Sequence, residues 1–134
     1  MSAATGWMQH LAVLPVLLPL VTAALLLALG DGAGAHGHAA LARARRVSVV
    51  SVALGLAVAV LLVLEADARD WLVYRLGDWP APFGIVIVVD RLSAIMVLLT
   101  QVIATAVVIY ASGGWDAHGR HFHALLQFQL MGLN

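Results

Sequence analysis

Residues 47–64 read VSVVSVALGLAVAVLLVL, a stretch without a single charged side chain. At 1.5 Å per residue, a helix of this length measures about 27 Å, close to the thickness of the hydrocarbon core of a bilayer. Leu11–Leu29 and Leu92–Ala111 have a similar length and character. The sequence therefore predicts three complete transmembrane helices, at about residues 11–29, 47–64 and 92–111.

The composition agrees with a protein that is solvated by lipid. Of its 134 residues, 63 % are hydrophobic and 10 % are charged, whereas about a quarter of the residues of a soluble domain are charged. Cysteine is absent, which excludes disulfides and thiolate metal sites. The net charge is zero, so nothing indicates a nucleic-acid partner.

The first apolar stretch could alternatively belong to a secretory signal peptide. Ala33-Gly34-Ala35 resembles the small-residue site at which such peptides are cleaved. However, Met1–His10 contains no Lys or Arg, and the apolar stretch exceeds the usual apolar region of about 7–15 residues. We therefore favour a helix that stays in the membrane.

The chain turns apolar once more at His121–Asn134. A helix over this segment would measure about 21 Å, which is too short to cross a bilayer. We interpret it as a truncated fourth transmembrane helix, and the chain as the N-terminal part of a longer subunit. The alternative is a complete three-span protein whose last helix lies at the membrane interface.

The segment between the second and third apolar stretches is polar and aromatic. Trp71–Arg75 and Ile85–Val89 are rich in β-branched and aromatic residues, which favours two short strands. Gly77-Asp78 and Pro80-Ala81-Pro82 provide turn residues between them. We expect a small β-hairpin on the membrane surface, with Trp79 near the lipid headgroups. An irregular loop is the alternative.

Two features predict how the helices pack. Pro15 and Pro19 lie on one face of the first helix, and we expect that face to contact protein rather than lipid. Ser51, Gly55 and Ala59 recur every fourth residue and form a stripe of small residues that allows another helix to approach closely. The ordinary small-residue content of an alanine-rich chain is the alternative explanation for the stripe.

The distribution of arginine predicts the orientation in the membrane. No Lys or Arg precedes the first helix, whereas Arg43, Arg45 and Arg46 close the predicted loop Gly30–Arg46. Basic residues favour the cytoplasmic side, so we place the N-terminus outside the cytoplasm, this loop inside it and the hairpin outside it. The predicted fold is an all-α integral membrane protein with three complete transmembrane helices, a truncated fourth, and a small extracytoplasmic β-hairpin between the second and third.

Charged side chains are absent from the interior of the three predicted helices. Glu65, Asp90 and Arg91 lie at helix ends, where an ion pair or a helix cap explains them. Gln101, at the centre of the third helix, cannot titrate, and we expect it to seek a partner on another helix. We predict no catalytic residue and no cofactor-binding residue in this chain.

Histidines occur in two groups, His36 and His38 in the first loop and His118, His121 and His123 before the fourth helix. No Cys, Asp or Glu convincingly completes either group as a metal site. No phosphate loop or dinucleotide motif is present either. We therefore expect solvated loop histidines and no bound metal or cofactor.

Two sets of stretches, in this order and spacing, carry a resemblance to a known family. Residues 74–85 read YRLGDWPAPFGI and lead into VDRLSA at 89–94, while FHAL at 122–125 leads into QFQLMGLN at 127–134. They resemble the D subunit of the multisubunit Mrp-type monovalent cation/proton antiporters. That protein is similar to the antiporter-like membrane subunits of respiratory complex I, and the stretch GDWPAPFGI favours the antiporter.

The resemblance implies that the chain is part of an antiporter complex, which exchanges Na⁺ or K⁺ for H⁺ across the bacterial inner membrane. The other subunits of that complex would be its partners. It also implies a subunit several times longer, whose proton path uses a glutamate on the fifth helix and lysines on later ones. None of those positions falls in this chain, so no residue here is assigned to transport. Two alternatives stay open: a proton-pumping membrane subunit of an NADH-quinone oxidoreductase or membrane hydrogenase complex, and a small membrane protein that only packs helices.

Overall fold

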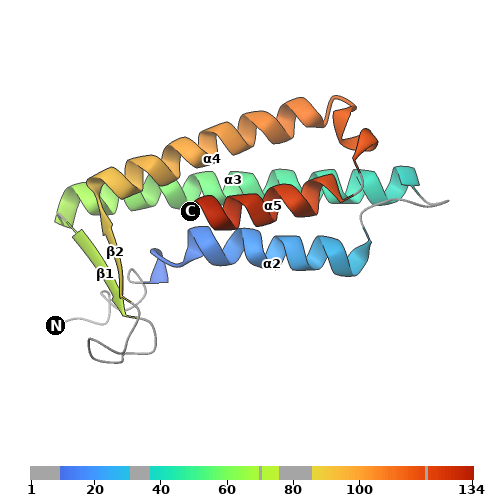
Figure 1. Ribbon diagram of the computed structural model, residues 1–134. Coiled ribbons are helices and arrows are strands. Elements are labelled where there is room, and N and C mark those ends of the chain that lie inside the picture. Colours follow the sequence, from blue (N-terminus) through green and yellow to red (C-terminus); the bar gives the residue numbers. More distant parts are fainter. Residues whose placement is uncertain (1–9, 31–36, 70, 76–85, 120) are drawn as a thin grey trace.

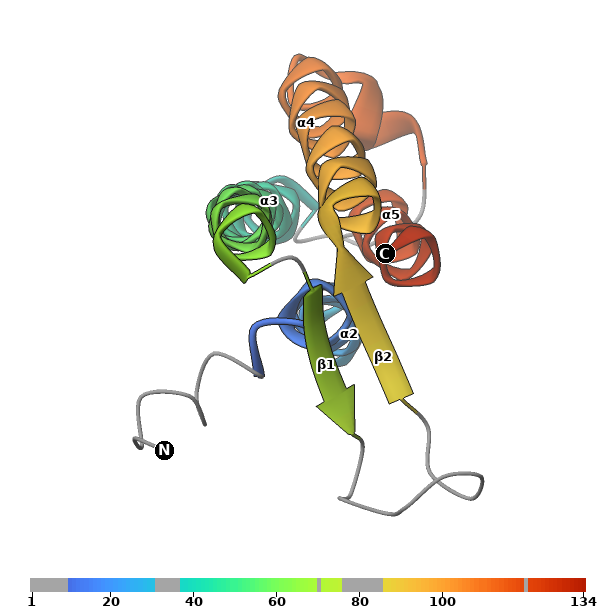
Figure 2. The same cartoon turned by 90° about the vertical axis from the view of Figure 1, so that its left-hand side faces the viewer.

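The computed structural model describes residues 10–30, 37–69, 71–75, 86–119 and 121–134. In these residues the helices lie side by side, and a two-stranded sheet projects from one end (Figure 1). Seen along the bundle, α2, α3, α4 and α5 surround a common centre (Figure 2). The elements in chain order are α2 (Leu14–Leu29), α3 (Gly37–Arg69), β1 (Trp71–Arg75), β2 (Val86–Asp90), α4 (Arg91–Ala111), the 3₁₀ helix η2 (Trp115–His118) and α5 (Phe122–Leu133).

The second helix is much longer than predicted. We expected it at 47–64, after a loop at Gly30–Arg46, but α3 runs from Gly37 to Arg69, so the loop prediction is wrong from Gly37 onward. Hydropathy marks only the part of a helix that lipid can solvate, whereas the Ala, Leu and Arg residues that fill 39–46 are strong helix formers. At about 50 Å, α3 is longer than the hydrocarbon core of a bilayer is thick.

The other helices lie close to the predicted segments. α4 matches the helix predicted at 92–111 to within one residue, and α5 covers most of the segment 121–134. α2 begins at Leu14 rather than Leu11 and spans 16 residues. Among the described residues, α3 and α4 are long and apolar enough to cross a membrane, and α2 is a shorter apolar helix.

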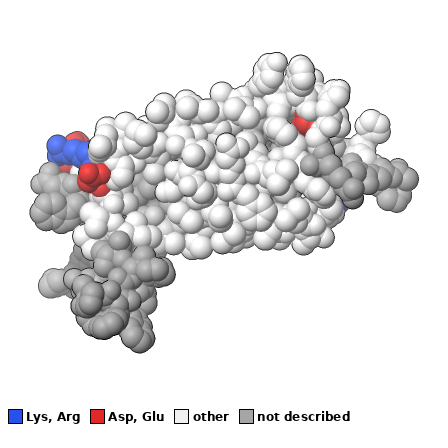
Figure 3. Space-filling view, in the orientation of Figure 1, with Lys and Arg blue, Asp and Glu red and all other residues white. Residues whose placement is uncertain are grey.

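The surface of the bundle is apolar along most of its length. On the face drawn in Figure 3, charged side chains lie at the two ends, and the length between them shows none. In the most apolar 18-residue stretch of each helix, only 33 % of α3 and 22 % of α4 is buried inside the protein. The exposed remainder includes large side chains such as Leu61, Ile103 and Tyr110. An apolar area of this extent marks a surface that lipid or other protein covers.

β1 and β2 form an antiparallel pair in which residues 71–75 face residues 90–86. Both strands lie within one residue of the predicted ones. Val89 is buried and packs with residues of α3 and α4 at the end of the bundle, whereas Val88, on the other face of the strand, is exposed. The predicted turn residues and Trp79 fall at 76–85, outside the described residues.

The two prolines of α2 face the interior of the bundle, as predicted, because both are buried. Proline has no N–H, so Pro19 leaves the carbonyl of Pro15, one turn earlier, without its usual helical donor. Asn134 Nδ2 donates to that carbonyl at 3.0 Å. A side chain at the C-terminal end of α5 thus satisfies the carbonyl that α2 cannot satisfy itself.

The predicted stripe of small residues on α3 is buried, and its central member faces α4. A Cβ atom placed on Gly55 would stand 2.7 Å from Gln101 Oε1 and 3.0 Å from Gln101 Cδ. Because Gly55 has no side chain, the amide group of Gln101 can lie directly against the backbone of α3. Close approach through small residues is a common way for membrane helices to associate.

We predict that Gly55→Leu lowers the free energy of unfolding by about 1–3 kcal/mol, because the new side chain must displace the buried Gln101 amide. Gly132→Leu is the matched control, since a Cβ atom there meets no atom within 4 Å. Thermal unfolding in detergent measures the difference. Adding Gln101→Ala to Gly55→Leu should recover part of the loss, and equal stability of the two leucine variants would contradict the packing.

Candidate functional site

A buried carboxylate joins three segments at one end of the bundle. Asp116, in η2, is 1 % exposed, and its two oxygens accept hydrogen bonds from Nε and Nη2 of Arg45 on α3, at 2.5 Å each. Its Oδ2 also lies 3.0 Å from Nε2 of His123 on α5, which is itself 1 % exposed. We refer to these side chains as the Arg45–Asp116–His123 cluster.

The turn after α4 places Asp116 in this position. α4 ends at Ala111, whose carbonyl accepts a hydrogen bond from the N–H of Gly114 at 3.1 Å. Gly114 has φ = 129°, which a residue with a side chain rarely adopts, and it turns the chain into η2. His121 then takes a left-handed conformation, with φ = 60°, as α5 begins. As a result, His123 faces Asp116.

The cluster holds Asp116 in its charged form. The hydrogen bonds from Arg45 keep the pKa of Asp116 below its ordinary value of 3.8, burial acts in the opposite direction, and the contact with His123 lowers the pKa further. Arg45 reaches both oxygens as a fork, which is the strongest geometry for this pair. Nε2 of His123 contacts the same carboxylate and donates to it whenever this nitrogen carries a proton.

A second group of buried polar side chains lies one to two turns further along the bundle. Thr22 Oγ1 on α2 lies 2.7 Å from the carbonyl of Leu18 and shares a hydrogen bond of 3.0 Å with Ser51 Oγ on α3. Ser51 Oγ in turn donates to Gln127 Oε1 on α5 at 3.4 Å. The Thr22–Ser51–Gln127 chain therefore connects three helices.

Several buried polar atoms beside these two groups have no hydrogen-bond partner among the described residues: Ser48 Oγ, His123 Nδ1, Gln127 Nε2 and Gln101 Oε1. Ser48 lies one turn from both Arg45 and Ser51 on α3, and Gln127 lies one turn from His123 on α5. The polar side chains thus form a row along the inside of the bundle, from the Arg45–Asp116–His123 cluster to Gln101. Buried groups of this kind commonly hydrogen-bond to water.

Ionisable side chains lie at only one end of this polar row. Gln101, Gln127 and the serine and threonine hydroxyls do not ionise near neutral pH. The ionisable members are those of the Arg45–Asp116–His123 cluster, where η2 connects α4 to α5. The arrangement can therefore orient water and hold the helices together, but it offers no group that binds and releases a proton near Gln101.

At the opposite end of the bundle, Asp90 caps α4 and Arg91 forms an ion pair, as predicted, whereas Glu65 lies inside α3 rather than at its end. Asp90 accepts a hydrogen bond from the N–H of Ser93 at 2.8 Å, while Ser93 Oγ accepts one from the N–H of Asp90 at 2.9 Å. The hydrogen bonds from Ser93 lower the pKa of Asp90. Arg91 forms an exposed ion pair with Asp67 at 3.4 Å.

The expectation of solvated loop histidines is wrong for His123, which is buried in the cluster. His38 and His118 are exposed, as expected, but they lie in α3 and η2 rather than in loops. His121 is half-buried, and His36 lies outside the described residues. In the described part of the chain, no group of three or more His, Cys, Asp or Glu side chains could hold a metal ion.

Sequence patterns did not predict that Asp116 and Arg45 interact. One signal could have pointed to them, because Asp116 is the only acidic residue after Asp90. A single carboxylate between two apolar helices is costly to bury unless it is paired. Its partner Arg45, 71 positions earlier, could not be identified from spacing alone.

We predict that Asp116→Asn lowers the free energy of unfolding by about 3 kcal/mol, because it removes a buried carboxylate that is in hydrogen-bond contact with both Arg45 and His123. Asp67→Asn is the matched control, since that pair with Arg91 is exposed and should cost less than about 1 kcal/mol. Chemical denaturation in detergent measures both. Similar losses in the two variants would contradict a special role for Asp116.

The same carboxylate sets an acid limit on stability. Since the folded-state pKa of Asp116 lies below 3.8, its contribution is complete above about pH 5 and is lost as the pH falls through the folded-state value. Unfolding midpoints measured from pH 6 to pH 3 should therefore fall more steeply in the unchanged protein than in Asp116→Asn. Parallel curves would show that the carboxylate adds nothing to stability.

No protein-family profile matches the chain. The chain is 41 % identical over 130 residues to a protein of Rhizobium meliloti (strain 1021) that is named as the probable D subunit of a K⁺/H⁺ antiporter. The match takes in 97 % of this chain and 24 % of that protein, so the chain spans about a quarter of the length of this relative. Nearly the whole chain therefore matches part of the larger D subunit of an antiporter, which confirms the resemblance seen in its sequence.

Proposed function

We propose that this chain forms part of the membrane domain of a monovalent cation/proton antiporter, which exchanges K⁺ or Na⁺ for H⁺. The observation that carries the proposal is its 41 % identity, over 97 % of its length, to a protein named as part of a K⁺/H⁺ antiporter. The apolar surfaces of α3 and α4 are consistent with a place in the membrane. The name of the relative does not favour the alternative of a respiratory-complex subunit.

Within such an antiporter, this segment supports the structure rather than carrying the ion. Its apolar stretches 11–29, 47–64 and 92–111 contain no Asp, Glu, Lys, Arg or His, and a transport path through a membrane usually needs ionisable groups inside it. The polar row instead ties the helices together. We assign proton and cation transfer to the remainder of the assembly, with other subunits as partners of the apolar surface.

The proposed location is the bacterial inner membrane, with the N-terminus on the extracytoplasmic side. Arg43, Arg45 and Arg46 lie near the start of α3, and basic residues at the end of a membrane helix favour the cytoplasm. β1 and β2 lie at the opposite end of the bundle (Figure 1). The three spans then consist of α2 with residues 11–13 before it, α3 and α4, and the sheet is extracytoplasmic.

We predict that a cysteine introduced at Ala39 reacts with an impermeant thiol reagent only from the cytoplasmic side. Ala39 is exposed near the start of α3, and residues 1–134 contain no native cysteine. A cysteine at Val88 of β2, which is 55 % exposed, is the matched control and should react only from outside. Labelling of both in intact cells and in everted vesicles decides the orientation, and the reverse pattern would overturn it.

Transport tests the function. In everted vesicles that contain the complete complex, adding K⁺ or Na⁺ after an imposed pH gradient should restore the fluorescence of a quenched pH dye. Proteoliposomes that contain residues 1–134 alone should show no more recovery of dye fluorescence than empty liposomes, because the segment has no ionisable group at mid-depth.

Two outcomes would contradict the proposal. Exchange by residues 1–134 alone, abolished by a single substitution in them, would show that the transporting groups lie in this segment. A complete complex that pumps protons only when it oxidises NADH, and does not respond to K⁺ or Na⁺, would favour the respiratory alternative.

A further inference from the structure

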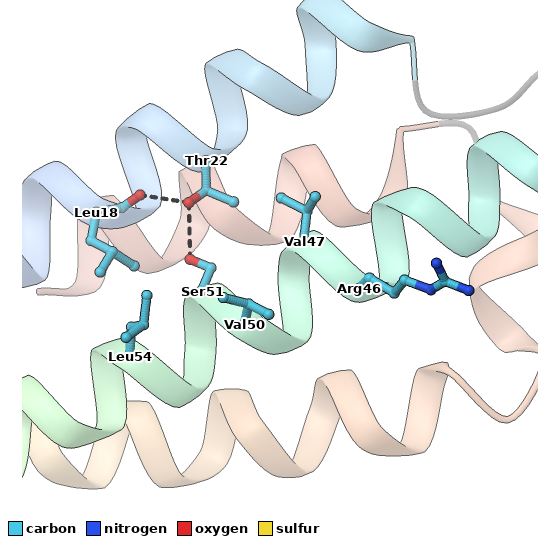
Figure 4. Close-up of a pocket in the computed structure, with 7 residues that line it drawn as sticks. All are labelled: Leu18, Thr22, Arg46, Val47, Val50, Ser51 and Leu54. Atoms are coloured by element: carbon cyan, nitrogen blue, oxygen red, sulfur yellow. Dashed lines mark hydrogen bonds between the residues drawn. The ribbon is translucent and has the colours of Figure 1, made fainter.

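A groove lies between α2 and α3 on the outside of the bundle. It has a volume of about 300 Å³, and seven residues line it: Leu18, Thr22, Arg46, Val47, Val50, Ser51 and Leu54. Figure 4 shows that they come from two helices that run next to each other, with Arg46 at one end of the set. The groove is separate from the Arg45–Asp116–His123 cluster.

The lining of the groove is suited to hydrocarbon. Val50 and Leu54 are 57 % and 53 % exposed, so their apolar surfaces are open to a ligand. The hydroxyls of Thr22 and Ser51 hydrogen-bond to each other, and Thr22 also contacts the carbonyl of Leu18 (Figure 4). These polar atoms are thereby satisfied within the protein, and an apolar ligand leaves them undisturbed.

One end of the groove carries a cation that the described residues do not neutralise. Arg45 binds Asp116, and Arg43 donates to the carbonyl of Leu29. Arg46 is exposed and has no hydrogen-bond or ion-pair partner among the described residues. In Figure 4 its side chain extends away from the apolar lining, toward the N-terminal end of α3. A negative group at that position would pair with it.

The length of the groove distinguishes a lipid from a helix. From Arg46 to Leu54 the rise along α3 is about 12 Å. One leaflet of the hydrocarbon core is about 15 Å deep, half of the whole core. A neighbouring helix would pack along the full bundle, whereas an acyl chain below a headgroup needs only the depth of one leaflet.

We propose that this groove binds an acyl chain of an anionic phospholipid, whose phosphate pairs with Arg46. The inference rests on the membrane placement in the proposed function but not on transport. Basic pockets between membrane helices on the cytoplasmic side suit such headgroups, and the arginines near the start of α3 give this end the appropriate charge. The bound lipid fills the apolar groove and neutralises the exposed guanidinium.

The test is lipid retention by the purified complex that contains this chain. The complex in detergent is titrated with phosphatidylglycerol or phosphatidylcholine, and bound lipid is counted by native mass spectrometry. Arg46→Gln should weaken phosphatidylglycerol binding about fivefold, the effect expected for one basic residue at a headgroup. Arg43→Gln, which removes the same charge near the same helix end but outside the groove, should leave binding unchanged.

A second pair of variants tests the apolar part of the site. Val50→Trp should fill the groove and abolish retention of the lipid, whereas Val49→Trp, at an exposed position that does not line the groove, should not. Inorganic phosphate at millimolar concentration should not displace the lipid, because most of the contact is apolar.

Three results would overturn the lipid assignment: equal effects of Arg46→Gln and Arg43→Gln, equal effects of the two tryptophan variants, or a cysteine at Val50 that cross-links to another subunit in the intact membrane. The last result would identify a protein helix as the occupant. Loss of lipid binding with normal cation exchange would leave the proposed function intact, so the two proposals fail separately.

Discussion

Asp116 places a buried negative charge at one end of a bundle whose surface is largely apolar. Two side chains, from different helices, contact this carboxylate. Arg45 approaches from α3, and His123 approaches from α5. Removing either partner would leave a buried carboxylate with fewer hydrogen bonds, which is destabilising. The position of η2, the start of α5 and the packing of α5 against α3 therefore depend on the same few hydrogen bonds.

Polar contacts determine how these helices pack because the hydrophobic effect, which drives the folding of soluble proteins, contributes little between helices that lipid already solvates. Apolar side chains gain little by leaving hydrocarbon for a protein interior, so helices in a membrane associate through close packing and hydrogen bonds. This chain uses both. Gly55 allows Gln101 to lie against the backbone of α3, and the Thr22–Ser51–Gln127 chain connects α2, α3 and α5.

The sequence predicted the helices and strands well where composition determines them. Uniform apolar stretches located the helices, β-branched residues located the strands, and the spacing of Pro15 and Pro19 identified a buried face. It failed at the start of α3, because hydropathy does not report helix propensity in residues 39–46. It also missed the Arg45–Asp116–His123 cluster, since spacing along the sequence cannot reveal which distant side chains the folded chain brings together.

The hydrogen bond between Asn134 and Pro15 has a consequence for the order of assembly. The two residues are 119 positions apart, and ribosomes deliver membrane helices from the N-terminus onward. α2 thus enters the bilayer with the Pro15 carbonyl lacking its helical donor, and it keeps that defect until α5 is synthesised and docks beside it. A polar contact that α2 needs is therefore supplied only after the other described helices of the bundle have been made.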